Sequence, residues 1–581
     1  MKGGTIMANV TRRTFLGATG LAAAGLGAPG AQPVSSANRT PEDREKRPNI
    51  VVIMTDDHGY GDLGCHGNPH VRTPHIDKFY TESVRFTNFY TTPVCSPTRA
   101  GFMTGRYNFR TGVVDTYMGR SMMDASEITV AEALREAGYR SGIFGKWHLG
   151  DNYPMRPIDK GFDESVVHRG GGIAQPHEPI MTSYFNPILQ HNGEERKYAG
   201  YCTDVFTNEA ITFIEKHQHE PFFVFVPTNT AHTPLIIHDR YIQPYRDMGL
   251  DEETARVYAM VENIDENVGR LLDTLDELGL SEDTFVMFLS SNGGQFSPGA
   301  DRYTAGLRGR KTTVYEAGIR VPCLIRWPRK LPGGRDIRQF GAHVDFFPTV
   351  LGMCGLPLPD DRAIDGRDLM PLMTGEIDGE EWPERHIFQQ WHRGDEPEPF
   401  RNAAVIGPRY KLVDGEQLYD LIDDPGEEND IAGEHPDLVV DMRQLYEEWL
   451  EDVSASRGYH PVRIHVNADY ENPTLLTSQD WRGTDTWYNV RAAHWALHIE
   501  QPGRYYVSLV TLDRRSTGRA RIECGGKTYE KDFPEWNAKW TFTDVELPAG
   551  DTRLAFEILE YNDEGDMGVD GARFAEIARV G

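Results

Sequence analysis

The chain has 581 residues, with 60 Lys and Arg against 88 Asp and Glu, and a formal net charge of −28. Charged residues make up 25% and hydrophobic residues 39%, which is typical of a globular protein. The acidic balance excludes broad nucleic-acid binding, which requires a basic surface. A small basic pocket on an acidic protein can still bind an anion. Six cysteines are too few for a disulfide scaffold, so a single thiol with a special role must be considered.

Residues 1–31 are predicted to be an export signal. They contain no Asp or Glu, and Arg12 and Arg13 precede an apolar run of small residues from Phe15 to Ala28. The string Thr11–Leu16 resembles the twin-arginine signal of bacterial export. The alternative is a membrane anchor, but the run is too short and glycine-rich to span about 30 Å of hydrocarbon. We therefore expect export to the periplasm or the extracellular space, with no stable membrane insertion after signal removal.

After a polar linker at 32–47, the chain alternates between two patterns up to residue 384. Apolar, β-branched runs predict buried strands, and amphipathic patterns between them predict helices, most clearly at 126–138 and 252–278. The predicted strands are 49–54, 141–145, 221–226, 284–289 and 321–326. This alternation predicts an α/β domain over 48–384, with a mostly parallel central sheet flanked by helices.

Two further domains are predicted after residue 384. Over 385–460, short strands precede a helix near Pro436–Leu450, which indicates a small α+β subdomain. Over 461–581 helical periodicity disappears and alternating runs predict an all-β sandwich. Several aromatic residues of this region could stack on sugars, although such residues more commonly fill the core of their own domain. They are Trp481, Trp487, Tyr488, Trp495, Trp536 and Trp540.

Polar residues follow several of the predicted strands, at the edge where open α/β sheets bind ligands. Asp56 and Asp57 follow strand 49–54, and paired carboxylates suit a cation that prefers oxygen ligands. The alternative is an ordinary Asp-rich turn. Lys146 and His148 follow strand 141–145 and, being two residues apart, point the same way in extended backbone. They would place a cation beside a titratable imidazole, unless they are a solvated lysine and a structural histidine.

Three further positions carry weaker signals. His232 follows strand 221–226, Ser291 and Asn292 follow strand 284–289, and Lys311 ends the string Leu307–Lys311. A single histidine, asparagine or lysine is more often structural than catalytic.

The most specific string is Cys95-Ser96-Pro97-Thr98-Arg99, followed by Thr104-Gly105-Arg106. Burial as a free thiol is the common fate of a lone cysteine, but prolines, hydroxyls and Arg99 surround this one. The Cys-x-Pro-x-Arg pattern closely resembles that of the type I, formylglycine-dependent sulfatase family, in the alkaline-phosphatase-like superfamily. The resemblance covers about residues 47–455 and includes the other motifs in the same order. The remaining cysteines have no motif and are expected to be free buried thiols.

The resemblance implies that a formylglycine-generating enzyme converts Cys95 to formylglycine. The hydrate of that group attacks sulfur, and the resulting sulfate ester is broken by elimination. The resemblance also implies one Ca²⁺ per chain, bound by Asp56, Asp57, Asn292 and residue 95, which polarises the sulfate. The family usually has Asp where this chain has Ser291, so this position lacks a negative charge. Ser291, Gln295 or water would complete the metal site.

The same resemblance assigns the other site residues. Arg99 would hold the formylglycine, and Lys146 and Lys311 would bind sulfate oxygens and neutralise developing charge. His148 would assist elimination, and His232 would protonate the leaving alcohol.

The expected function is hydrolysis of sulfate esters on poly- or oligosaccharides, as in an exported bacterial carbohydrate sulfatase. Export and an added β domain suit a polymeric extracellular substrate. The first alternative is a phosphodiester or phosphonate monoester hydrolase of the same superfamily, because tetrahedral anions need similar ligands. The second is a catalytically silent sulfate-binding protein, which only Ser291 supports. His66, His177 and His191 lie in loops that could reach the substrate, although solvated loop histidines are more common.

Overall fold

The computed structural model describes residues 47–484, 486, 490–511, 517–535, 537–562 and 571–580. The predicted export signal at 1–31 and all but the last residue of the predicted linker lie outside these ranges. Within them, no helix combines the length and the apolar character needed to cross a bilayer.

The α/β part is built on a ten-stranded sheet with the order β11-β2-β10-β9-β1-β8-β4-β5-β6-β7. Strands β9, β1, β8, β4 and β5 are neighbours and run parallel, whereas β10, β6 and β7 are antiparallel to their neighbours. The strands are β1 (Asn49–Thr55), β2 (Val84–Phe86), β4 (Arg140–Lys146), β5 (Glu164–His168), β6 (Ile188–His191), β7 (Glu194–Lys197), β8 (Phe222–Pro227), β9 (Thr284–Ser290), β10 (Cys323–Arg326) and β11 (Arg335–Ile337). The predicted fold class, α/β with a mostly parallel sheet, is confirmed.

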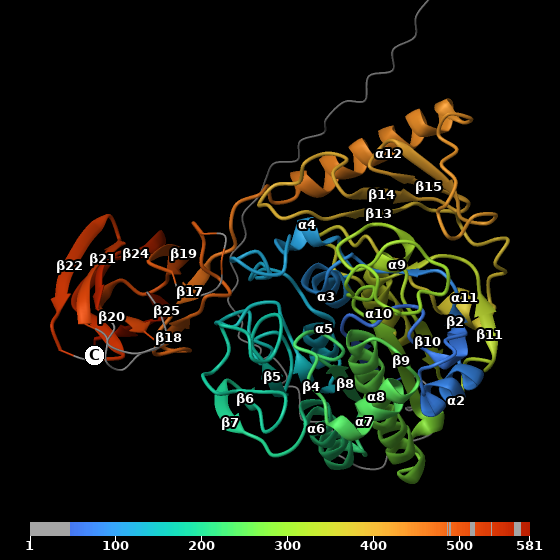
Figure 1. Cartoon of the computed structure of the whole chain (residues 1–581), viewed down its shortest axis with the longest axis horizontal. Coiled ribbons are helices and arrows are strands. Elements are labelled where there is room, and N and C mark those ends of the chain that lie inside the picture. Colours follow the sequence, from blue (N-terminus) through green and yellow to red (C-terminus); the bar gives the residue numbers. More distant parts are fainter. Residues whose placement is uncertain are drawn as a thin grey trace, which may run out of the picture. The chain divides into compact units, whose positions relative to one another are not determined.

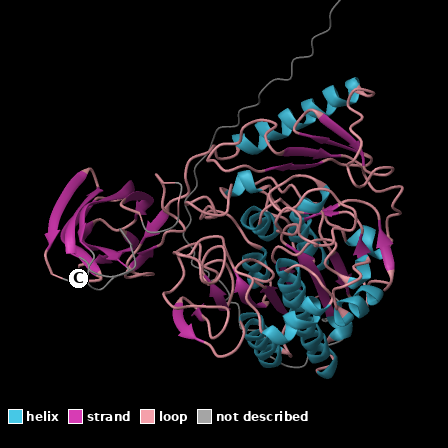
Figure 2. Cartoon of the chain, in the orientation of Figure 1, coloured by secondary structure: helices cyan, strands magenta, loops and turns pink. Residues whose placement is uncertain are grey.

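Strand β1 is buried on both sides. Ile50, Val52 and Met54 belong to one apolar core and Val51 and Ile53 to another, because side chains alternate across a strand. Figure 2 shows helices gathered around this sheet. The helices of the α/β part are α2 (Pro74–Glu82), α3 (Cys95–Thr104), α4 (Asn108–Thr111), α5 (Val130–Glu136), α6 (Cys202–His217), α7 (Asp239–Asp247), α8 (Glu252–Glu277), α9 (Glu316–Ile319), α10 (Phe346–Met353) and α11 (Met370–Thr374). Shorter elements are the 3-10 turns η1 (Gly64–His66), η2 (Ser281–Asp283) and η3 (His343–Asp345) and the paired strands β3 (Phe89–Tyr90) and β12 (Gly341–Ala342).

A four-stranded antiparallel sheet and one long helix follow, as the sequence predicts for this region. The strands are β13 (Ile387–Gln390), β14 (Ala403–Ile406), β15 (Tyr410–Val413) and β16 (Gln417–Asp420). Helix α12 (Pro436–Ala455) lies along this sheet (Figure 1). Tyr446 and Trp449 of α12 belong to the same apolar core as Val405 and Leu412 of the sheet.

The C-terminal region contains two sheets with a shared apolar core, which confirms the predicted all-β architecture. One sheet has the order β17-β19-β24-β21-β22 and the other β18-β25-β20-β23. The strands are β17 (Ile464–Val466), β18 (Thr474–Leu476), β19 (Ala492–Ile499), β20 (Gly503–Thr511), β21 (Thr517–Cys524), β22 (Lys527–Phe533), β23 (Lys539–Leu547), β24 (Gly550–Asn562) and β25 (Ala572–Arg579).

The described tryptophans of this sandwich fill its core. Trp481, Trp495 and Trp540 are fully buried, so these three are not available to stack on a sugar. The other aromatic candidates, Trp487, Tyr488 and Trp536, lie outside the described residues. Met122 and Met155 from the α/β part belong to the same core, so apolar packing joins the sandwich to it.

Candidate active site

The candidate residues gather at one edge of the central sheet. Strands β9, β1, β8 and β4 are adjacent and parallel, so the loops at their carboxyl ends meet there. Asp56 donates its N–H to the carbonyl of Thr230 at 2.9 Å, and Ser291 donates its N–H to that of Thr55 at 2.9 Å. The polar loops are thus held together by the same kind of hydrogen bond as the strands before them.

Each carboxylate of the Asp56–Asp57 pair contacts a lysine. Lys146 Nζ lies 2.5 Å from Asp56 Oδ2, and neither side chain has any exposed surface. Lys311 Nζ lies 2.6 Å from Asp57 Oδ1. Burial raises the pKa of Asp56, but Lys146 and further cations outweigh this effect and hold the pKa well below its usual value. The pKa of Asp57 is lowered in the same way, mainly by Lys311 against burial, so both groups are carboxylates at neutral pH.

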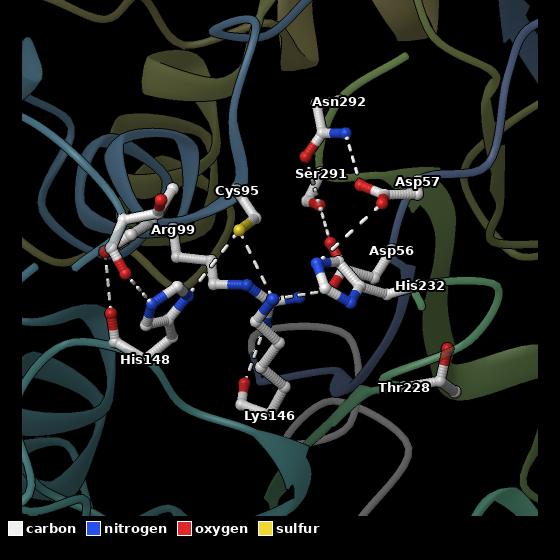
Figure 3. Close-up of polar contacts among 12 residues, drawn as sticks. Asp56, Asp57, Cys95, Arg99, Lys146, His148, Thr228, His232, Ser291 and Asn292 are labelled. Atoms are coloured by element: carbon white, nitrogen blue, oxygen red, sulfur yellow. Dashed lines mark hydrogen bonds and ion pairs between the residues drawn. The ribbon is translucent and has the colours of Figure 1, made fainter. Parts of the chain in front are cut away.

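Cys95 is the first residue of α3, a helix that the sequence analysis did not predict. Its Sγ lies 3.2 Å from Lys146 Nζ and 3.5 Å from His148 Nδ1 (Figure 3). Ser96 Oγ donates to the carbonyl of His148 at 2.7 Å, which ties the start of α3 to the loop after β4. Cys95 is therefore buried in contact with an ammonium and an imidazole.

Arg99 lies one helical turn after Cys95 and is also buried. Its Nη1 donates to the carbonyl of Lys146 at 2.6 Å. Its Nε and Nη2 atoms are buried without a hydrogen-bond partner in the described part of the chain. A buried guanidinium with free donors can bind a polar group that is added beside it.

The position of His148 corrects one prediction. Strand β4 ends at Lys146, and His148 has a φ of 62°, in the left-handed region. The two side chains therefore converge on Cys95 through a turn rather than along an extended strand. His148 Nε2 lies 2.7 Å from the carbonyl of Thr116. Burial, followed by the charge of Lys146, lowers the pKa of His148 well below its usual value, so the ring is neutral.

His232 is held on the other side of the acidic pair. Its Nδ1 lies 2.6 Å from the carbonyl of Thr233, and its Nε2 lies 3.8 Å from Asp57 Oδ2. Because a carbonyl only accepts, Nδ1 carries a proton and Nε2 points toward the acidic pair. Burial, followed by the charge of Lys311, lowers the pKa of His232 to about 4.

Ser291 and Asn292 complete an oxygen-rich set. Ser291 Oγ lies 2.9 Å from Asp56 Oδ1, and Asn292 Nδ2 donates to Asp57 Oδ1 at 2.8 Å. Across the described ranges, no group of three or more His, Cys, Asp and Glu side chains is arranged to hold a metal ion. The candidate set instead combines two carboxylates with an amide and a hydroxyl, all buried, which suits a cation that prefers oxygen. The side chain of Gln295 is exposed and does not join this set.

An ion pair that supports Asp57 was missed by the sequence analysis. Arg302 Nη2 donates to the carbonyl of Asp57 at 2.7 Å, and its Nε donates to Asp62 Oδ1 at 3.0 Å. Asp62 Oδ2 in turn accepts the N–H of Gly59 at 2.6 Å. The two partners are 240 residues apart, and neither belongs to a motif, so nothing in the sequence pairs them.

The other loop histidines and cysteines have structural contacts. His66 Nδ1 lies 2.7 Å from the carbonyl of Tyr60, and His191 Nδ1 lies 2.6 Å from the hydroxyl of Tyr198. His177 is fully buried. All six cysteines are free, and those without a motif are buried except the half-buried Cys65.

Residues 48–356 match the family model described as sulfatase, and residues 309–453 match the model described as N-sulphoglucosamine sulphohydrolase, C-terminal. The chain belongs to the sulfatase family. This membership makes the protein a sulfuric ester hydrolase and confirms the resemblance carried by the Cys95–Arg99 string.

Two relatives of this sulfatase are named as sulfatases of N-acetylgalactosamine, and a solved structure of similar fold holds an oligosaccharide. The N-acetylgalactosamine-6-sulfatase of Canis lupus familiaris is 35% identical over 405 residues, which cover 64% of this chain and 72% of the relative. The N-acetylgalactosamine-6-O-sulfatase of Bacteroides thetaiotaomicron is 29% identical, covering 69% of this chain and 93% of the relative. The crystal structure of Ps i-CgsB in complex with k-i-k-neocarrahexaose has a TM-score of 0.64 and 28% identity, covering 71% of this chain and 95% of that one.

Proposed function

We propose that this sulfatase removes sulfate from poly- or oligosaccharides and that Cys95, as formylglycine, provides its nucleophile. The relatives named for N-acetylgalactosamine 6-sulfate support a saccharide substrate. The observation that carries the proposed chemistry is the environment of Cys95. Its Sγ contacts Lys146 Nζ and His148 Nδ1 beside two charged carboxylates, and no other cysteine of the described chain has such neighbours.

The residues around position 95 fit a formylglycine hydrate, which would supply the attacking hydroxyl. Arg99 has two buried donors without partners, and a second hydroxyl at residue 95 could accept from them. His148 Nε2 lies 2.7 Å from a carbonyl that can only accept, so Nε2 holds the ring proton and Nδ1 is free to accept one. We assign His148 Nδ1 as the acceptor of the hydroxyl proton whose loss drives elimination.

Asp56, Asp57 and Asn292, with Ser291 and residue 95, would hold a Ca²⁺, which would polarise the bound sulfate and acidify the nucleophile. The two lysines that contact the acidic pair, Lys146 and Lys311, are the cations that we assign to the sulfate oxygens. Lys146 and Lys311 would neutralise the negative charge that develops on those oxygens in the transition state.

His232 is assigned as the proton donor to the leaving alcohol. With a pKa of about 4, it is neutral in the free enzyme at neutral pH. Binding of the anionic sulfate beside Nε2 would favour the protonated ring and so raise its pKa. The proton would then be present when the S–O bond breaks.

Maturation and location follow from the same proposal. Conversion of Cys95 would require a formylglycine-generating enzyme as a partner before folding, because Cys95 is buried in the folded chain. The string Thr11–Leu16 would direct export to the periplasm or beyond. Changing both Arg12 and Arg13 to Lys should retain the protein in the cytoplasm, as measured by cell fractionation, and unchanged export would contradict this assignment.

The modification is tested by the mass of the peptide that contains Cys95. Protein produced with a formylglycine-generating enzyme should show the change of CH₂–SH to CHO, and Cys95→Ala should abolish sulfate release. Cys65→Ala, at a half-buried cysteine without a motif, is the matched control and should retain activity. Active protein with an unmodified thiol at position 95 would refute the proposed nucleophile.

The substrate class is tested by measuring sulfate release from 6-sulfated N-acetylgalactosamine oligosaccharides, carrageenan oligosaccharides and 4-nitrophenyl sulfate. A phosphodiester is the comparison substrate. We expect kcat/KM to be highest on one of the sulfated saccharides. Higher kcat/KM on 4-nitrophenyl sulfate than on every saccharide would argue against a saccharide substrate, and turnover of the phosphodiester alone would argue against sulfate ester hydrolysis.

A further inference from the structure

A residue from the segment before β19 of the sandwich reaches the active site. Gln479 is 2% exposed and lies against the histidine assigned above as proton acceptor. Its Nε2 lies 2.7 Å from the carbonyl of Thr116, 2.8 Å from Ser121 Oγ and 3.3 Å from His148 Nε2. A side chain 331 residues away in the sequence thus shares one acceptor with His148.

The chemistry of these atoms decides how the hydrogen bonds are arranged. An amide nitrogen has two hydrogens and no lone pair to accept with, so Gln479 donates to Thr116 and to Ser121. His148 Nε2 also donates to the Thr116 carbonyl, at 2.7 Å. The carbonyl therefore accepts two hydrogen bonds. The orientation of this carbonyl keeps the His148 proton on Nε2. Nδ1 is then unprotonated, and it lies 3.5 Å from Cys95 Sγ.

The segment that carries Gln479 is anchored on both sides. Trp495 of β19 donates its Nε1 hydrogen to the carbonyl of Thr477 at 2.8 Å, and Trp481 is fully buried in the sandwich core. Toward the active site, the N–H of Gly119 donates to the carbonyl of Gln479 at 3.0 Å. Gly119 has a φ of 66°, and a Cβ there would lie 2.8 Å from the carbonyl of Asp480, so the two backbones are in close contact.

Arg482, in the same segment as Gln479, makes a second contact with Gly119. Its Nη2 donates to the carbonyl of Gly119 at 2.6 Å. The loop that carries Thr116 is therefore held by the sandwich through both backbone and side-chain hydrogen bonds.

We propose that Gln479 is a positioning residue of this sulfatase, through which the C-terminal sandwich fixes the Thr116 carbonyl and hence the tautomer and orientation of His148. The inference rests on the proposed role of His148. Substitution of a group that orients a metal-bound imidazole typically costs about 10–100-fold in affinity or activity, and we expect a loss of similar size for an imidazole that accepts a proton. The sandwich is then a structural part of the catalytic centre rather than only an appended module.

Two variants of similar size separate positioning from packing. Gln479→Met keeps the volume and removes both donors, and Gln479→Glu places a carboxylate against the Thr116 carbonyl. With 4-nitrophenyl sulfate as the probe, we expect kcat to fall about tenfold for Gln479→Met and further for Gln479→Glu, with little change in KM. Gln501→Met is the matched control, because Gln501 also makes side-chain hydrogen bonds but only within the sandwich. It should leave kcat unchanged.

A crystal structure of Gln479→Met gives a readout that does not depend on activity. We expect the Thr116 carbonyl to turn and its hydrogen bond with His148 Nε2 to lengthen or break. An unchanged Thr116–His148 geometry, or an unchanged kcat with a lower unfolding temperature, would overturn the inference. A wild-type enzyme that carries formylglycine at position 95 and releases no sulfate from any substrate would instead refute the proposed function, while the geometry would still test the role of Gln479.

Discussion

Lys146 and Asp56 form an ion pair with Nζ 2.5 Å from Oδ2, and both side chains are fully buried. Removing one partner of a buried pair leaves an uncompensated charge and typically costs about 3–5 kcal/mol. Lys146→Met should therefore lower the midpoint of thermal unfolding strongly, besides reducing kcat. Lys216→Met is the matched control, since its ion pair with Glu164 is exposed and worth at most about 1 kcal/mol. Equal shifts of the two midpoints would contradict this prediction.

Gly293, next to Asn292, has no room for a side chain. A Cβ at this position would lie 1.9 Å from the carbonyl of Ala317, which is backbone and cannot rotate away. Gly293→Ala should cost at least about 1–3 kcal/mol, the usual range for overpacking, and should move Asn292. Gly433→Ala has nothing within 4 Å of the new Cβ and should fold normally. Thermal unfolding of both variants checks the difference, and a Gly293→Ala variant as stable as Gly433→Ala would contradict it.

The carboxyls of Asp480 and Asp151 form a like-charge pair near the sandwich boundary. Burial, followed by the charge of Asp151, raises the pKa of Asp480 well above its usual value, and burial also raises that of Asp151. The folded protein then binds protons more tightly than the unfolded chain, so the stability contributed here falls as the pH rises through the raised pKa.

Asp480→Asn should therefore raise the unfolding midpoint at pH 8 more than at pH 5. Thermal unfolding across this range measures the difference. Asp239→Asn is a suitable control because Asp239 is an exposed residue of α7, and its effect should not vary in this way. An Asp480→Asn shift that is independent of pH would show that the carboxyl pair does not destabilise the folded protein as the pH rises.

Ser291 can be tested by restoring the carboxylate that the family usually has. Its Oγ lies 2.9 Å from Asp56 Oδ1, so Ser291→Asp would place a third negative charge beside the acidic pair. Without calcium, repulsion should lower the unfolding midpoint. With saturating Ca²⁺, the gain in midpoint should exceed that of the wild type, because a carboxylate is a stronger calcium ligand than a hydroxyl. Ser291→Ala should show no such gain, and an identical calcium response in all three proteins would contradict the prediction.

Much of the α/β architecture could be predicted because its information is local. The run at 49–54 is β-branched and apolar and became β1, and the amphipathic pattern at 252–278 became α8. The meeting of Asp56, Asn292 and His232 also followed from the sequence. Each comes after a parallel strand, and parallel strands end at a common edge.

Other parts of the site had no local signal. The helical start at Cys95 was missed because Pro97 and the small polar residues beside it resemble a loop. The predicted extended arrangement of Lys146 and His148 was wrong because His148 adopts a left-handed conformation that no residue type in the string demands.

The sequence by itself determined which chemical groups this sulfatase carries, their order along the chain and the strands that precede them. Only the tertiary structure decided that Lys146 and His148 both reach Cys95, that burial keeps the imidazoles neutral, and that Gln479 shares an acceptor with His148. The reason is physical. Periodicity reports the neighbours within one strand or helix, whereas contacts across hundreds of residues depend on how the finished layers pack.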